Sequence, residues 1–175
     1  MSITLVIGGC RSGKSGHALR LAETLSERNR VFIATCRPMD EEMRQRVAKH
    51  QRERDPSWRV VEDVSDLGEA IRQAACPDGV VLVDCLTLWA ADLLWSGSDM
   101  EAALDRLMEG MRASSGPVVL VSGEVGLGMV PENAMARAYR DAVGLINQRV
   151  AALADRVVWM VAGIPVVIQD RSQKA

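Results

Sequence analysis

Gly8-Gly9-Cys10-Arg11-Ser12-Gly13-Lys14-Ser15 is the stretch that decides the fold, and it follows directly on the short apolar run from Thr4 to Ile7. Gly8, Gly13, Lys14 and Ser15 fill the phosphate-loop pattern, in which a Gly is followed after four residues by Gly-Lys-Ser/Thr. The glycines let backbone N–H groups curl around a phosphate, and the helix that begins behind them adds a favourable dipole. A chance match in a chain of this length has a probability below about 1%. The stretch therefore predicts a strand, a phosphate-binding loop and a helix.

Lys14, Ser15 and Asp84 are the side chains that we expect to act on a bound nucleoside triphosphate. Lys14 would reach the outer phosphates, and the Ser15 hydroxyl would hold Mg²⁺. Asp84 ends a run of four aliphatic residues, which is the usual sequence form of a Walker B carboxylate that holds Mg²⁺ directly or through water. The alternative is that Asp84 caps a helix beginning at Leu86. Given the phosphate loop, we favour the metal role.

Arg11 and Cys10 lie inside the loop, and each allows two interpretations. Arg11 could contact a phosphate oxygen or stay in solvent at the mouth, and the spacing does not decide between them. Cys10 fits a small buried residue of the loop better than a nucleophile.

Apolar strands alternate with helical patterns along the rest of the chain, which predicts an α/β fold with a mostly parallel sheet and helices on both faces. We expect one phosphate-loop NTPase domain of the RecA-like type over residues 1–175. The expected strands are residues 2–7, 30–35, 58–62, 80–84, 118–122 and 156–161, with 166–168 as a candidate antiparallel edge strand. The expected helices are residues 14–28, 39–54, 66–75, 86–95, 100–112 and 132–155.

Ligands of such sheets bind beyond the carboxyl ends of the strands. The residues that we expect at those ends are Gly8, Thr35, Glu62, Asp84 and Gly123. The sequence therefore predicts the functional site at this edge of the sheet.

Composition excludes several other classes of function. The net charge of −2 and the 3% of aromatic residues leave no basic or stacking surface for nucleic acid. The apolar runs are of strand length, too short to cross a bilayer, and the N-terminus lacks the pattern of a secretory signal. The four cysteines are scattered without C-x-x-C spacing, which is typical of reduced thiols in a cytoplasmic protein.

His50 stands in a stretch dense in cations. A neutral imidazole can attack an α-phosphorus, and nearby cations would stabilise a leaving pyrophosphate. From spacing alone an ordinary half-buried helix position is favoured, because Met43, Val47 and His50 also form a helical stripe. Glu124 could orient a nucleophile or have a structural role. A further run of polar residues could be a solvated helix face or a subunit contact, and it consists of Arg137, Arg140, Asp141, Asn147, Gln148 and Arg149.

Several motifs together carry a family resemblance over nearly the whole chain. They are the phosphate loop, Ile33-Ala34-Thr35, Asp40-Glu41-Glu42-Met43 with Arg46 and His50, Trp58-Arg59 with Glu62, the run from Gly123 to Asn133, and Tyr139-Arg140-Asp141 with Gly144 and Asn147-Gln148. In this order they resemble the bifunctional adenosylcobinamide kinase/adenosylcobinamide-phosphate guanylyltransferases of cobalamin synthesis.

The resemblance implies two reactions. ATP or GTP first phosphorylates the aminopropanol hydroxyl of adenosylcobinamide, and GMP is then transferred from GTP to that phosphate through a GMP–histidine intermediate. The matching histidine here is His50, which reverses the weighting from spacing alone. The implied nucleotide contacts are Gly8, Gly9, Cys10, Arg11, Ser12, Gly13, Lys14, Ser15, Ala34, Thr35, Cys36, Gln51, Arg52, Glu53, Arg54, Glu62 and Asp84. Mg²⁺ would be held by Ser15 and Asp84, and the family's trimeric state is implied as well.

The chain departs from the family at two positions. Lys49 precedes His50 where some members have a second histidine, which makes His50 the clearer nucleophile. Asp84 stands where some members carry Glu, a change of reach rather than of role. Two other hypotheses remain, a phosphate-loop kinase of another small molecule with an inert His50, and a nucleotide-switched binding module.

Overall fold

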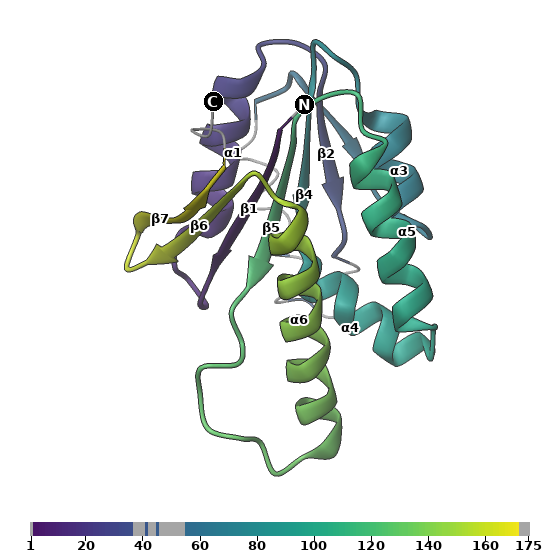
Figure 1. Cartoon of the computed structure of the whole chain (residues 1–175), viewed down its shortest axis with the longest axis vertical. Helices are drawn as coiled ribbons and strands as arrows, with labels where there is room; N and C mark the ends of the chain where they lie inside the picture. Colours follow the sequence, from purple (N-terminus) through teal and green to yellow (C-terminus); the bar gives the residue numbers. More distant parts are fainter. Residues whose placement is uncertain (1, 37–40, 42–44, 46–54, 172–175) are drawn as a thin grey trace.

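The computed structural model describes residues 2–36, 41, 45 and 55–171, in which seven strands form one sheet (Figure 1). Every neighbouring pair is parallel except the last, in which β6 and β7 are antiparallel. This confirms the mostly parallel α/β sheet and the antiparallel edge strand. The order across the sheet is β3 (Trp58–Val61), β2 (Arg30–Ala34), β4 (Val80–Asp84), β5 (Val118–Gly123), β1 (Ile3–Gly8), β6 (Arg156–Val161) and β7 (Ile164–Asp170).

Two hydrophobic layers cover the sheet, one on each face. Alternate residues of one strand enter opposite layers, as Leu5 and Val6 of β1 do. The residues of both layers are buried, which explains why the central strands are apolar at nearly every position. The first layer packs against α3 (Leu67–Ala74), α4 (Leu86–Ser96), α5 (Met100–Arg112) and α6 (Ala134–Leu153), and the second against α1 (Lys14–Leu25).

Side-chain caps set where several helices begin, and an extended backbone ends α1. The α6 helix begins at Ala134, two residues later than predicted, because Asn133 Oδ1 accepts the Ala136 N–H at 3.1 Å. The α3 helix follows Asp66, whose carboxylate accepts the Glu69 N–H at 2.9 Å. The α1 helix ends at Leu25 rather than at residue 28, since Ser26 is already extended.

The strand register brings the predicted ends of the strands to one edge of the sheet. Gly8 of β1 lies opposite Gly123 of β5, and Ala34 of β2 lies opposite Asp84 of β4. The loops that leave these strands therefore gather at the edge where ligands of parallel sheets bind. The helix predicted over residues 39–54 falls almost entirely outside the described residues. Within the described part of the chain, no helix combines the length and the apolar character needed to cross a membrane.

Candidate active site

The phosphate loop folds tightly between β1 and α1. A Cβ atom on Gly8 would lie 2.6 Å from Ser12 Oγ and 2.8 Å from the Met160 carbonyl oxygen, so only glycine fits there. Gly13 has a φ of 86°, in the left-handed region that glycine adopts without strain. Ser12 is buried beneath the loop, and its hydroxyl is without a hydrogen-bond partner. The sequence pattern is thus matched by a loop that packs tightly against its own Ser12 side chain and against Met160 of β6.

Neighbouring segments brace this loop through its carbonyl groups. The Gly163 N–H, in the turn between β6 and β7, donates to the Ser12 carbonyl at 3.2 Å. On the other side, the Glu124 N–H donates to the Gly8 carbonyl at 3.0 Å. The loop is therefore held from both neighbouring strands of the sheet.

The N-terminus of α1 is open to an anion. Its N-cap residue is Gly13, which supplies no side-chain acceptor, so no side chain caps the first N–H groups of the helix. Lys14 Nζ donates to the Gly9 carbonyl at 3.2 Å, which holds the ammonium group across the loop. Open N–H groups, a helix dipole and a nearby cation are the features that favour an anion such as phosphate.

The other loop side chains differ in exposure. Ser15 is half-buried at the start of α1, whereas Arg11 and Cys10 are exposed. The expectation that Cys10 is a buried loop residue is therefore wrong, because the loop turns its side chain outward. Arg11 has a φ of 54° and lies at the mouth in solvent.

Asp84 is the half-buried last residue of β4, and the next helix does not use its side chain as a cap. The N-cap residue of α4 is Cys85, and no side-chain cap hydrogen bond is present there. The capping alternative for Asp84 is therefore not what the structure contains. The Asp84 carboxylate therefore ends β4 on the same edge of the sheet as the phosphate loop.

Thr35 fixes the backbone that follows Asp84. Its hydroxyl donates to the Cys85 carbonyl at 2.7 Å and accepts the Cys85 N–H at 2.8 Å. The Thr35 N–H also donates to the Asp84 carbonyl at 3.3 Å. The Asp84–Cys85 peptide bond is cis. The Thr35 side chain, directly after β2, is thus hydrogen-bonded to the backbone that follows β4.

Cys85 is a structural thiol. Burial, followed by the nearby Asp84 carboxylate, raises the pKa of Cys85 to about 11, so the thiol is neutral at physiological pH. Its Sγ lies 2.8 Å from the Thr87 hydroxyl, and the Tyr139 hydroxyl donates to the Thr87 carbonyl at 3.3 Å. Burial, followed by Cys85, raises the pKa of Tyr139 as well. Neither group supplies a charge to the site at neutral pH.

The remaining predicted residues divide into two groups. Ala34 and Cys36 are half-buried near the end of β2, and Glu62 is exposed just after β3. These lie on the same edge as the phosphate loop, several strands away. The second group, His50, Gln51, Arg52, Glu53 and Arg54, lies outside the described residues.

A loop between β5 and α6, residues 124–133, forms what we call the arm. Arg140 donates to three of its carbonyls, those of Met129, Gly126 and Gly128, at 3.0, 2.7 and 3.3 Å. Arg137 donates to the carbonyls of Pro131 and Glu132. Glu124 Oε1 accepts the Gly126 N–H at 2.8 Å, which favours the structural role for this side chain. Figure 1 shows the arm extending with α6 beyond the rest of the molecule.

The loop contacts of these arginines were not predicted from the sequence. Their charge alone suggested a solvated or subunit-contacting helix face, whereas they hold a loop from the same chain. One sequence signal could have indicated these contacts. The arginines lie in the first turns of a helix, and the glycine-rich segment before that helix has many backbone carbonyls that need hydrogen-bond donors. Asn147 belongs with them, because its side-chain amide donates to the Gly123 carbonyl at 3.1 Å.

A phosphate loop between β1 and α1, with a carboxylate at the end of a parallel strand, defines the chain as a phosphate-loop NTPase of the α/β class. The fold agrees with that of a KaiC-like protein from the archaeon Pyrococcus horikoshii, with a TM-score of 0.55 and 13% identity over 99% of this chain and 81% of that chain. The chain belongs to the cobinamide kinase / cobinamide phosphate guanyltransferase family, whose sequence model matches residues 4–168.

Curated relatives agree with this assignment. The chain is 38% identical to the bifunctional adenosylcobalamin biosynthesis protein CobU of Salmonella typhimurium, over 94% of this chain and 98% of that protein. It is 37% identical to the bifunctional adenosylcobalamin biosynthesis protein CobP of Pseudomonas aeruginosa, over 94% and 96%. The chain is therefore an enzyme of cobalamin biosynthesis, a kinase and a guanylyltransferase that uses nucleotide substrates.

Proposed function

We propose that the chain phosphorylates the aminopropanol hydroxyl of adenosylcobinamide, using ATP or GTP, and then transfers GMP from GTP to the new phosphate. The products of the second step are adenosylcobinamide-GDP and pyrophosphate. The observation that carries the proposal is the uncapped N-terminus of α1 behind the phosphate loop, with Lys14 across the loop, in a chain of this family. Phosphoryl transfer needs mainly alignment and charge neutralisation, which Lys14 and the loop N–H groups would supply.

Mg²⁺ would be held by the Ser15 hydroxyl and the Asp84 carboxylate. These residues fit the ion, because Mg²⁺ in nucleotide sites takes only one or two protein oxygens, with phosphates and water as the other ligands. Consistent with this, no cluster of three or more metal-binding side chains occurs in the described part of the chain. When bound, Mg²⁺ neutralises charge on the phosphates. We expect Asp84→Glu to keep part of the activity and Asp84→Asn to lose most of it, with Mg²⁺ titrations of the initial rate as the measurement.

His50 would be the nucleophile of guanylyl transfer. The neutral imidazole attacks the α-phosphorus of GTP, the bond to the β-phosphate oxygen breaks, and pyrophosphate leaves. The substrate phosphate then displaces the imidazole from the GMP group. Arg52 and Arg54 would support departure of pyrophosphate, and Gln51 and Glu53 would contact the nucleotide. Support for these assignments is the family membership and the family's motif in this sequence.

The other nucleotide contacts are proposed on the same basis. They are Gly8, Gly9, Cys10, Arg11, Ser12 and Gly13 in the phosphate loop, and Ala34, Thr35, Cys36 and Glu62 further along the edge of the sheet. We also propose a single nucleotide-binding domain over residues 1–175, a homo-oligomer that is a trimer, and a cytoplasmic location. Gel filtration with light scattering would test the trimer.

Trapping of radioactive label tests the two-step function. Wild-type protein incubated with α-³²P-GTP should retain label that is acid-labile and base-stable, as a phosphoramidate is, and γ-³²P-GTP should leave none. Another small-molecule kinase or a nucleotide switch would retain neither label. His50→Ala should abolish α-label retention and GMP transfer while leaving much of the kinase activity. If His50→Ala protein still carried the α label, the nucleophile would be a different residue.

A further inference from the structure

Asn147 of α6 contacts the end of the strand that lies beside the phosphate loop. Its side-chain amide donates to the carbonyl of Gly123, the last residue of β5, which is paired with Gly8, the last residue of β1. Only the amide nitrogen of Asn147 can make this contact, because a carbonyl oxygen needs a donor. We infer that Asn147 is a positioning residue, which holds the phosphate loop in place for phosphoryl transfer without touching the nucleotide. The inference rests on the proposed function.

One peptide unit carries the contact from α6 to the loop. The Gly123 carbonyl and the Glu124 N–H belong to the same planar, trans unit and therefore point in opposite directions. Asn147 donates to the carbonyl at 3.1 Å, and the N–H donates to the Gly8 carbonyl at 3.0 Å. The unit is thus held at both ends. Because hydrogen bonds in a chain polarise one another, the bond from Asn147 strengthens the bond to Gly8.

Gly8 has no room to absorb a shift of this unit. A Cβ on Gly8 would meet Ser12 Oγ and the Met160 carbonyl oxygen, so the residue is already packed closely against the loop and β6. Gly123 is confined as well, because a Cβ there would lie 2.7 Å from Thr87 Cγ2. A displacement of the end of β5 is therefore passed to the first residue of the phosphate loop. A misplacement of about 1 Å can lower the rate of a reaction by about 100-fold.

Stability alone does not favour an amide at position 147. The Asn147 Oδ1 is buried and has no hydrogen-bond partner in the described part of the chain, and the same is true of the Ser122 hydroxyl, one residue before Gly123. The buried residues of α6 are otherwise apolar. A buried acceptor without a donor costs free energy, whereas an apolar side chain of the same shape does not. The half-satisfied amide therefore indicates a role for the one hydrogen bond that it donates.

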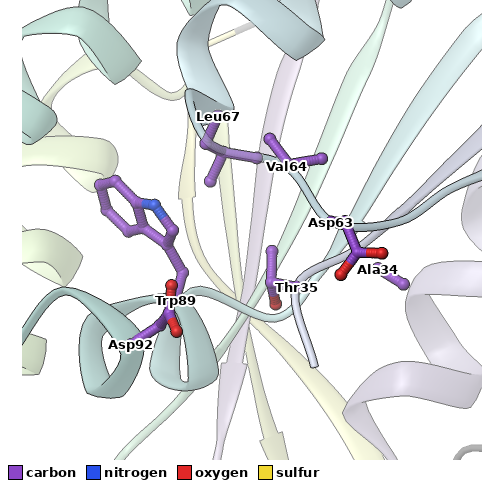
Figure 2. A pocket seen from close by; sticks show the side chains of 7 residues that line it. All are labelled: Ala34, Thr35, Asp63, Val64, Leu67, Trp89 and Asp92. Carbon is purple, nitrogen blue, oxygen red and sulfur yellow. The ribbon is translucent and has the colours of Figure 1, made fainter. Parts of the chain in front are cut away.

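The neighbouring strand, β4, ends in a comparable contact. The Thr35 hydroxyl bonds to both backbone polar groups of Cys85, directly after β4. Figure 2 shows the Thr35 side chain between those of Asp63 and Trp89. Asn147 differs from Thr35 in lying within a helix of 20 residues, so the packing of α6 sets its position. A side chain on such a rigid element positions a site more precisely than one on a loop does.

Isosteric removal of the donor tests the inference. Asn147→Leu keeps the size of the side chain and removes its donor together with its unpaired acceptor, so the Tm should stay within about 3 °C of the wild type. We expect kcat/KM for GTP in the kinase reaction to fall about tenfold, which corresponds to the loss of one hydrogen bond, with the KM for adenosylcobinamide unchanged. A purely structural residue would show the opposite pattern, a loss of Tm at constant kcat/KM.

Asn133→Ala is the matched control. It removes the side-chain cap of the same helix, in which Asn133 Oδ1 accepts the Ala136 N–H, and it leaves the Gly123 contact in place. It should lower the Tm by roughly 2–4 °C without changing kcat/KM for GTP. Gln148→Ala, at an exposed position next to Asn147, should change neither quantity. If Asn147→Leu does not fold, Asn147→Ala removes the same donor and carries the same expectation for kcat/KM.

Calorimetric titration with a non-hydrolysable GTP analogue adds a measurement that needs no turnover. The affinity should fall about tenfold in Asn147→Leu and stay unchanged in Asn133→Ala. If the wild type bound the analogue but did not phosphorylate adenosylcobinamide, the proposed function would fail, and the titration would still test Asn147. Equal affinities for the wild type and Asn147→Leu would overturn the inference. Equal losses in Asn147→Leu and Asn133→Ala would overturn it as well.

Discussion

The phosphate loop and the arm begin at the same place in the sheet and end in different kinds of structure. Gly8 and Gly123 are opposite each other at the ends of β1 and β5, and both are followed by a glycine-rich segment that leads into a helix. The phosphate loop buries Ser12 and closes on itself within a few residues. The arm extends outward and exposes Leu127, Met129 and Val130 by 77%, 95% and 71%.

The helix caps of the two loops differ, and only the cap of α1 leaves the first N–H groups without a side-chain acceptor. Gly13 leaves the first N–H groups of α1 without a side-chain partner, whereas Asn133 Oδ1 accepts an N–H at the start of α6. In the arm, Arg137 and Arg140 donate to backbone carbonyls. Glycine content therefore does not distinguish an anion site from a structural loop. The residue before the helix does, since Gly13 supplies no side-chain acceptor and Asn133 does.

The largest effect in this comparison should come from Lys14. We expect Lys14→Ala to lower kinase turnover by ~10³-fold or more, because its ammonium group would neutralise charge on the transferring phosphoryl group. Steady-state kinetics on folded protein measure this. Arg112→Ala, at an exposed position in the last turn of α5, is the control. A folded Lys14→Ala protein with near-normal turnover would contradict the phosphate-binding interpretation of the loop.

A matched pair of glycines should separate the two loops in stability. Gly8→Ala should lower the free energy of unfolding by about 1–3 kcal/mol, because the new Cβ overlaps Ser12 Oγ and the Met160 carbonyl. Gly128→Ala, where a Cβ meets nothing within 4 Å, should stay within about 0.5 kcal/mol of the wild type. Urea unfolding measures both. Equal losses in the two variants would show that the close approach at Gly8 is not what requires glycine.

Arg140→Ala should loosen the arm with a smaller effect on the whole molecule. Three backbone carbonyls lose their donor, and since the site is partly exposed we expect a loss of about 1 kcal/mol in stability. Limited proteolysis should cut residues 124–133 faster than in the wild type. Arg140→Lys should be intermediate, because one ammonium group cannot reach three separated carbonyls. Unchanged cleavage in Arg140→Ala would mean that other contacts hold the arm.

The smallest effect should be a pH dependence of the stability that comes from His17 in α1. Burial, followed by Arg20 and Arg156, lowers the pKa of His17. His17 in the unfolded chain therefore takes up a proton near pH 6.5, whereas His17 in the folded chain takes it up only at lower pH. The contribution of His17 to the free energy of unfolding is therefore present above pH 6.5 and is lost as the pH falls below it. His17→Gln should reduce the drop in Tm between pH 7.5 and pH 5. An identical drop in both proteins would exclude His17 as a source.

The fold was largely predictable because its signals are local. The apolar runs of β4 and β5 and the glycine pattern at residues 8–15 are contiguous in the sequence, so strands, helices and the functional edge followed from them. The predicted start of α6 was two residues too early, because the N-cap at Asn133 depends on a single side-chain hydrogen bond.

Parts of the candidate site were not predictable, for a different reason. The hydrogen bond from Thr35 to Cys85 joins residues that are distant in the sequence. The hydrogen bonds from Arg140 to the arm are accepted by backbone carbonyls. Residue type alone does not reveal them. The exposure of Cys10 depends on the fold of the loop and not on its residue type, which favoured burial. The roles of His50 and its neighbours stay predictions.

The place of β1 between β5 and β6 has a consequence for how the chain folds during synthesis. β1 is made first, and its partner strands in the sheet begin at Val118 and Arg156. At about 5–20 residues per second, β5 follows Gly8 after roughly 6–22 seconds of translation. The Gly163 N–H that braces Ser12 comes later still. The phosphate loop, although it is made before the other strands of the sheet, can therefore gain all its braces only when almost all of the described chain has been made.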